Sequence, residues 1–341
     1  MIEPSHLASR PAVPDATVVC PAGDLGVLWF DGFDAEAFLQ GQLSSDVAAV
    51  AAGASQRSSY NSPTGRMLAS LRLWRDPDVG TGHAYGALIA ADLAAPIAKR
   101  LAMFVLRSRV DVANATPAHA VLGVVGPQAE EAVAGAFGAP PIANGVATIA
   151  GGTARLIRLP DDRFLIVAIA EAEGEIRRAL GPRVVAGDAK LWRWWSIRAG
   201  VPLVTAATSD RFVPQMLNWD ALDGISFQKG CYPGQEIVAR TRYLGRLKER
   251  LYGFQLDRPA APEAGTRIFS PAFGDQPCGT VINAVEAPEG GAVLLAVLQI
   301  AAADSGVASL AAPDGPRLHA ITLPYSIAPT APPRQRAPRG A

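Results

Sequence analysis

Residues 211–246 read RFVPQMLNWDALDGISFQKGCYPGQEIVARTRYLGR and hold the densest group of polar and reactive side chains in the chain. Those side chains belong to Gln215, Asn218, Asp223, Lys229, Cys231, Gln235, Glu236 and Arg240. Pro233 suits the first position of a helix running PGQEIVARTR, because its missing N–H would have no partner there anyway. A helix N-terminus and the ammonium of Lys229 both favour the thiolate of Cys231, so we expect its pKa to be lowered. The competing interpretation is a tight structural turn in which the glycines serve backbone geometry.

Upstream of this stretch, strand-like and helix-like segments alternate through two similar cycles. The first cycle predicts strands at 25–30, 56–60, 66–75, 83–90 and 109–112 and helices at 35–40 and 92–106. The second predicts strands at 121–125, 153–159 and 163–169 and helices at 128–137 and 171–180. From Leu247 onward helix signals vanish, and short apolar segments separated by turns predict a small β-barrel that ends near Pro324.

The predicted fold class is therefore α+β, with two α+β units of mainly antiparallel sheet and a C-terminal β-barrel. We expect a first unit at residues 17–113 and a second at 114–245 that carries the cysteine-containing stretch. The barrel is expected at 246–326. Residues 1–16 and 327–341, rich in proline, alanine and arginine, are expected to be a flexible and a disordered tail.

Composition excludes several classes of protein. The 341 residues contain 31 Lys plus Arg and 31 Asp plus Glu, so net charge offers no argument for a nucleic-acid or membrane partner. No secretory signal is visible, and the longest apolar run, 290–300, is too short to span a bilayer, which predicts a soluble cytoplasmic protein. Three scattered cysteines and four distant histidines predict no self-contained metal site. Phosphate-binding, dinucleotide-binding and common hydrolase motifs are missing.

A second cluster, LWRWWSIRAGVP at 191–202, carries three of the six tryptophans. On a helix Trp192 and Trp195 share a face, whereas Trp194 points elsewhere. Stacking a planar heterocycle is one use of such an indole, and filling the core between two domains is the other.

The octapeptide KGCYPGQE at 229–236 is similar to the signature of the YgfZ family. These are folate-binding proteins of iron–sulfur cluster maintenance, related to the aminomethyltransferase of the glycine cleavage system. Further segments resemble the family in the same order, so that the resemblance covers roughly residues 20–327. They are FLQGQLSSDV (38–47), YNSPTGRMLASLRLWRD (60–76), LRSRVDV (106–112), IRAGVP (197–202), the stretch 212–251, CGTVI (278–282) and LPYSI (323–327).

The resemblance implies three domains around a central folate cavity, with two ferredoxin-like units and a barrel. Lys229 and Cys231 match the family's motif lysine and cysteine, which makes Cys231 the expected functional thiol. Trp192 matches a tryptophan implicated in folate binding and is expected to stack the folate ring. The expected cofactor is tetrahydrofolate, and Gln235, Glu236 and Arg240 are expected to shape the cavity.

Three departures from the family pattern qualify these expectations. Leu25 stands where relatives have a second folate-linked tryptophan. Arg198 replaces a glutamate suited to the donor nitrogens of a pterin, and it is expected to meet the glutamyl tail of a folate instead. Ala69 and Ser70 replace the aspartate pair of true aminomethyltransferases, so no aminomethyl transfer is expected.

The function that the resemblance implies is tetrahydrofolate binding in support of iron–sulfur cluster assembly or repair in client enzymes, including those that thiolate tRNA. The expected partners are these clients or assembly proteins, with no direct contact to nucleic acid or membrane, and the chain is expected to be a monomer. Two alternatives stay open. One is a folate-dependent methyl- or aminomethyltransferase, and the other is a client-binding scaffold with a vestigial folate site. Whether any reaction is catalysed is left open by the sequence.

Overall fold

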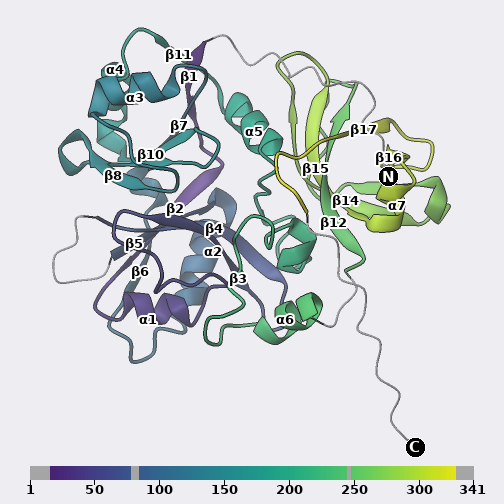
Figure 1. The fold of residues 1–341 in the computed structure, drawn as a ribbon, viewed down its shortest axis with the longest axis horizontal. Coiled ribbons are helices and arrows are strands. Elements are labelled where there is room, and N and C mark those ends of the chain that lie inside the picture. Colours follow the sequence, from purple (N-terminus) through teal and green to yellow (C-terminus); the bar gives the residue numbers. More distant parts are fainter. Residues whose placement is uncertain (1–15, 78–83, 244–246, 328–341) are drawn as a thin grey trace, which may run out of the picture.

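The computed structural model describes residues 16–77, 84–243 and 247–327. Predictions for the two tails therefore lie almost wholly outside the described residues, as do those for His83 and for residues 244–246. The described chain forms two sheets and a closed barrel, which confirms the predicted α+β class (Figure 1). In the part of the chain that the structure describes, no helix is both long enough and apolar enough to cross a membrane.

The first sheet has five antiparallel strands in the order β3–β4–β5–β2–β6. The strands are β2 (Leu25–Asp31), β3 (Ser55–Asn61), β4 (Met67–Arg75), β5 (Ala84–Ala90) and β6 (Asp111–Asn114). Helices α1 (Ala35–Gln40) and α2 (Ala91–Ala102) accompany this sheet. The predicted helix at 92–106 is too long at its end, because the chain leaves the helix after Ala102 and Leu106 adopts a positive φ of 46°.

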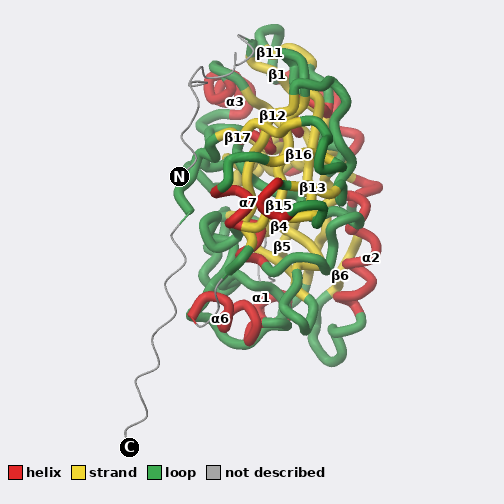
Figure 2. The backbone as a smooth tube through the Cα atoms, turned by 90° about the vertical axis from the view of Figure 1, so that its right-hand side faces the viewer, coloured by secondary structure: helices red, strands yellow, loops and turns green. Residues whose placement is uncertain are grey.

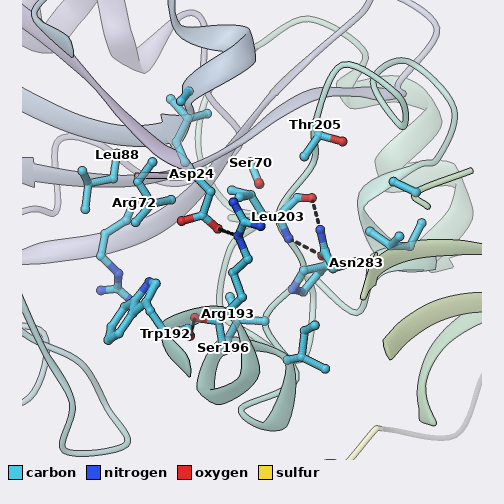
Figure 3. A pocket seen from close by; sticks show the side chains of 18 of the residues that line it. Asp24, Ser70, Arg72, Leu88, Trp192, Arg193, Ser196, Leu203, Thr205 and Asn283 are labelled. Carbon is cyan, nitrogen blue, oxygen red and sulfur yellow. Dashed lines mark hydrogen bonds and ion pairs between the residues drawn. The ribbon is translucent and has the colours of Figure 1, made fainter. Parts of the chain in front are cut away.

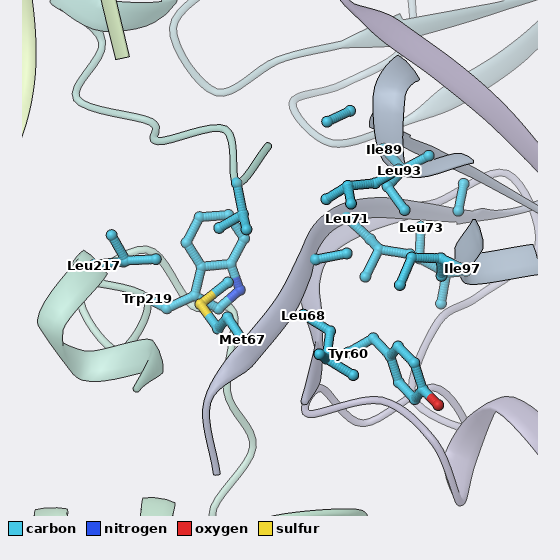
Figure 4. Close-up of a cluster of buried hydrophobic side chains, with 14 of the residues drawn as sticks. Tyr60, Met67, Leu68, Leu71, Leu73, Ile89, Leu93, Ile97, Leu217 and Trp219 are labelled. Carbon is cyan, nitrogen blue, oxygen red and sulfur yellow. The ribbon is translucent and has the colours of Figure 1, made fainter. Parts of the chain in front are cut away.

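Helix α2 follows β5 directly and buries one apolar stripe. The buried residues of the helix, Leu93, Ala94, Ile97, Ala98 and Leu101, recur at the spacing of a helical face. Figure 4 shows Leu93 and Ile97 of this stripe beside Leu71 and Leu73 of β4. The same hydrophobic core continues to Met67, Leu217 and Trp219, so the segment that carries Leu217 and Trp219 is packed onto the first sheet.

The second sheet has six strands in the order β11–β1–β7–β10–β9–β8. The strands are β1 (Thr17–Pro21), β7 (His119–Val125), β8 (Val146–Ile149), β9 (Ala154–Arg158), β10 (Phe164–Ile169) and β11 (Val184–Ala186). Helices α3 (Ala129–Phe137) and α4 (Glu173–Ala179) belong to this unit. Because β1 lies between β7 and β11, the first described strand completes the second sheet, whereas the expected unit 17–113 would have kept it with the first.

The C-terminal part closes into a six-stranded barrel in the order β12–β15–β14–β13–β16–β17. Its strands are β12 (Glu249–Leu256), β13 (Arg267–Phe269), β14 (Pro277–Glu286), β15 (Ala292–Gln299), β16 (Ala308–Leu310) and β17 (Arg317–Ile321), with helix α7 (Ile300–Asp304) after β15. Figure 1 places the barrel to one side of both sheets, and Figure 2, which views the molecule from that side, shows the barrel strands facing the viewer. The sequence prediction of a small barrel from Leu247 onward is confirmed.

Helix α5 (Ala189–Arg198) joins the second sheet to the barrel, because it contacts β1 of the second sheet and both β14 and β15 of the barrel. Its start is capped by Asp188, whose carboxylate accepts a hydrogen bond from the Leu191 backbone N–H at 2.8 Å. The tryptophans of α5 divide between cores as the helical spacing requires. Trp192 joins the core between the two sheets, and Trp194 joins the core of the first sheet and barrel.

Candidate functional site

A cavity of about 570 Å³ lies where the two sheets and the barrel meet, a size typical of small-molecule sites. Its walls come from β4 and β5 of the first sheet, α5 and β10 of the second unit, and β14 of the barrel (Figure 3). Apolar side chains such as Leu88, Leu165 and Ile282 alternate with charged ones on these walls. We refer to this space as the central cavity.

Trp192 forms part of the wall of the central cavity and is only 3% exposed. Gly123 on β7 makes room for its ring, because a Cβ there would lie 2.0 Å from an indole carbon. The guanidinium carbon of Arg163 lies 4.9 Å from the centre of the indole ring. Trp192 and Arg163 both line the cavity and contact each other. A ligand at this part of the wall would therefore contact both side chains.

The cavity wall also carries a carboxylate that the sequence analysis did not single out. Asp24 lies in the turn before β2, and Arg193 Nε donates to its Oδ2 at 3.3 Å (Figure 3). Its other oxygen, Oδ1, is buried without a hydrogen-bond partner among the described residues. Burial raises the pKa of this carboxyl, and Arg193 only partly offsets that effect. Asp24 thus presents an unsatisfied acceptor beside the ligand space.

Lys229 ties two motif segments together. Its Nζ donates to the backbone carbonyls of Gln40 at 2.6 Å, Leu43 at 2.7 Å and Ser45 at 2.9 Å. These carbonyls belong to the end of α1 and to the loop that follows it, within the FLQGQLSSDV segment. An ammonium has three N–H donors, and here each has a carbonyl acceptor. Burial lowers the pKa of Lys229 to about 8.

The loop that carries Cys231 does not start a helix at Pro233, so that prediction is wrong. Helix α6 (Gln235–Tyr243) begins two residues later, because Gly234 has a left-handed φ of 76°. A Cβ at Gly234 would lie 2.5 Å from the Cα of Gly65 in the NSPTG turn (residues 61–65). Pro233 and Gly234 therefore form a turn that docks the cysteine loop (residues 229–234) onto the NSPTG turn. Glu236 remains in the first turn of α6, where the helix dipole favours a negative charge.

Cys231 is exposed, whereas Cys20 and Cys278 are buried. Burial raises the pKa of Cys20 to about 11 and also raises that of Cys278. Access and protonation state both make these two thiols poor nucleophiles at neutral pH. Cys231 is therefore the cysteine that a partner or reagent in solution can reach.

The structure separates the predicted site residues into two groups. Among the predicted ligand-contacting residues, Trp192 lines the central cavity. Gln235, Glu236, Arg240 and Arg198, together with Lys229 and Cys231, are absent from the lining that the structure describes. Gln235 instead supports the cysteine loop, because its Nε2 donates to the Lys229 carbonyl at 3.5 Å.

The sequence analysis did not find four arginines that line the cavity: Arg57 on β3, Arg72 on β4, Arg163 just before β10 and Arg193 on α5. One signal was present, since Arg72 stands between Leu71 and Leu73 in an otherwise apolar strand. A cation in such a run indicates a polar partner or a cavity on that face.

The sequence of this chain is similar to those of known proteins along most of its length. No protein-family model matches the chain. The tRNA-modifying protein YgfZ of Shigella sonnei is 32% identical over 307 residues, which cover 89% of this chain and 92% of the relative. Its counterpart from Yersinia pseudotuberculosis is 33% identical over 307 residues, covering 89% of this chain and 91% of the relative. The chain belongs to the YgfZ family.

A solved structure supports the same fold for this YgfZ-family chain. The glycine cleavage system aminomethyltransferase T from Bartonella henselae aligns with a TM-score of 0.71 over 91% of this chain and 86% of its own. At 18% sequence identity the likeness concerns the fold alone. Three of the sequence motifs contact one another in this fold. KGCYPGQE packs against the NSPTG turn and hydrogen-bonds to the FLQGQLSSDV segment.

Proposed function

We propose that this protein binds tetrahydrofolate in the central cavity and supports iron–sulfur cluster assembly or repair in client enzymes, including those that thiolate tRNA. The observation that carries the proposal is the cavity itself, enclosed by all three parts, with Trp192 in its wall at the position that matches the family's folate-linked tryptophan. The names of the relatives support the link to tRNA modification.

Cys231 is the functional thiol in this proposal, acting towards a partner at the surface. Its exposure and its placement on the ordered cysteine loop support that role. Because Cys231 is absent from the lining of the cavity, folate binding and thiol chemistry belong to different surfaces of the protein. Folate would then act on the thiol through the fold rather than by direct contact.

The aminomethyltransferase alternative has little support in the cavity. Ser70 lines the cavity where the related enzymes carry an aspartate, and its Oγ accepts a hydrogen bond from the Val204 backbone N–H at 3.0 Å. Ala69 is fully buried and carries no polar group. A serine so engaged supplies no carboxylate for the proton transfers of aminomethyl chemistry.

Two experiments test the proposal. Calorimetry with tetrahydrofolate is expected to show binding that Trp192→Ala weakens by about 1–3 kcal/mol, the usual value of an aromatic stacking contact. A strain that lacks the gene is expected to lose iron–sulfur enzyme activities and thiolated tRNA, with rescue by the wild type and not by Cys231→Ser. No detectable folate binding, combined with full rescue by Trp192→Ala, would favour the vestigial scaffold.

A further inference from the structure

Three guanidinium groups meet in one part of the central cavity and form what we call the arginine cluster: Arg57, Arg72 and Arg163. Arg57 and Arg72 are direct partners in the antiparallel register of β3 and β4. Like charges directly opposite one another on paired strands repel, which destabilises the pair. Arg163 brings a third positive charge from the second sheet.

The arginine cluster has too few negative partners of its own. Arg57 donates one hydrogen bond to the Leu222 carbonyl at 3.2 Å, and its Nε is buried without a partner in the described part of the chain. Arg72 donates to two neutral side-chain oxygens, both at 3.1 Å. Among the described residues the carboxylate that pairs with the cluster is Asp161, which accepts from Arg163 Nε at 2.8 Å.

The surroundings make this excess of positive charge costly. Burial lowers the pKa of Arg72 to about 9, and the neighbouring Arg57 lowers it further. Burial likewise lowers the pKa of Arg57. An anion placed among the three groups would satisfy the free donors and reverse these penalties.

We propose that the arginine cluster binds the carboxylates of a glutamyl tail, so that the cavity selects glutamylated folates over the bare pteroyl group. This inference rests on the proposed folate function and names which folates are bound. Planar guanidinium forks match carboxylates in two-point contacts, which favours this class of anion. Arg198, which the sequence analysis assigned to the tail, is absent from the cavity lining, and the cluster takes over that role.

The rest of the wall fits a ligand in this orientation. Arg163 contacts the Trp192 indole, so the aromatic ring next to the tail, the p-aminobenzoyl group, would pack on Trp192. Asp24 has a free Oδ1 acceptor, which suits the N–H and amino donors of the pterin. The cavity thus offers an acceptor for the donor-rich end of a folate and donors for its acidic end.

The test compares tetrahydrofolate, its triglutamate and tetrahydropteroate, which lacks glutamate, by calorimetry on the full chain. Wild type is expected to bind both glutamylated compounds about 10–100-fold more tightly than tetrahydropteroate, which corresponds to about 1.4–2.8 kcal/mol. Arg57→Gln is expected to remove most of this preference and to leave tetrahydropteroate binding within about twofold. Arg178→Gln, on the exposed surface of α4, is the matched control and is expected to keep the preference.

The outcomes separate the two proposals. If wild type binds tetrahydropteroate as tightly as tetrahydrofolate, the arginine cluster does not read the tail, while the folate function stands. If none of the three compounds binds, the folate function fails and this inference fails with it. If tripolyphosphate displaces tetrahydrofolate more effectively than a free triglutamate peptide does, the cluster is a phosphate site and the carboxylate assignment is wrong.

Discussion

Replacing Lys229 with methionine tests whether the motif lysine acts as a structural tie. The Lys229→Met side chain is similar in length and has no donor, so the carbonyls of Gln40, Leu43 and Ser45 lose their shared partner. Each buried carbonyl left unsatisfied costs about 1–3 kcal/mol, which gives a loss of about 3–9 kcal/mol for three.

Removing the buried ammonium offsets part of this loss. A pKa of about 8 in place of 10.5 means that burial disfavours the charged form by about 3.4 kcal/mol, at about 1.36 kcal/mol for each pH unit. Subtracting this offset from the loss leaves a destabilisation of about 0–6 kcal/mol, with a middle value of about 3 kcal/mol, at pH 7, where the ammonium is charged in both the folded and the unfolded chain. At about 2.1 cal/mol/K per residue the unfolding entropy of this 341-residue chain is about 0.7 kcal/mol/K, so the middle value lowers the melting temperature by roughly 4 °C.

Differential scanning calorimetry at pH 7 measures this effect, with hydrogen exchange of the α1 amides as the local readout. Lys99→Met, an exposed lysine in the last turn of α2, is the matched control and should change the melting temperature by about 1 °C or less. If Lys229→Met melts within 1 °C of wild type and α1 keeps its protection, the tie contributes nothing. The lysine would then have to act through the thiol, as its place in the motif first suggested.

Three more predictions follow from the same geometry. Brief iodoacetamide treatment at pH 7.5 should label Cys231 before the two buried cysteines, and tetrahydrofolate should not protect it, because the thiol does not line the cavity; strong protection, seen by peptide mapping, would put the thiol in the folate site. Gly234→Ala should cost about 2–4 kcal/mol in denaturant unfolding, because it meets both a left-handed φ and the Gly65 backbone, whereas Gly174→Ala, on α4 with open space around it, should be neutral or slightly stabilising. Arg198→Glu should leave tetrahydrofolate affinity within about twofold, and a loss of tenfold or more by calorimetry would return Arg198 to the binding site.

Local patterns in the sequence predicted most of the elements but not their partners. The period of two in LGVLWFD and the apolar stripe of α2 are local signals, and both segments form the predicted type of element, although α2 ends at Ala102 and not at Leu106. The sequence analysis did not predict strand β1, because VVC is a short apolar run and its partners β7 and β11 are far along the chain. Which strands become neighbours depends on long-range packing, which a single sequence does not display.

The same limit explains the outcome at the site. Trp192 was found through the family resemblance, and it lines the central cavity, while its contact with folate stays a prediction. Pro233 satisfied every local rule for a helix start, but the contact between Gly234 and Gly65 decided the backbone there. Arg57 and Arg72 become a cluster only when β3 and β4 pair in register.

The position of β1 in the second sheet affects how the protein folds while it is being synthesised. Strand β1 leaves the ribosome first among the described elements, yet its partners begin at His119 and Val184. At roughly 5–20 residues per second, β1 waits at least about 5–20 s for β7 and longer for β11. During that interval a strand of apolar residues has unpaired edges, which makes it a natural binding segment for chaperones. A fragment that ends after the first sheet would leave β1 permanently without its partners β7 and β11. The first unit is therefore best expressed either without residues 17–21 or with the chain extended through residue 186.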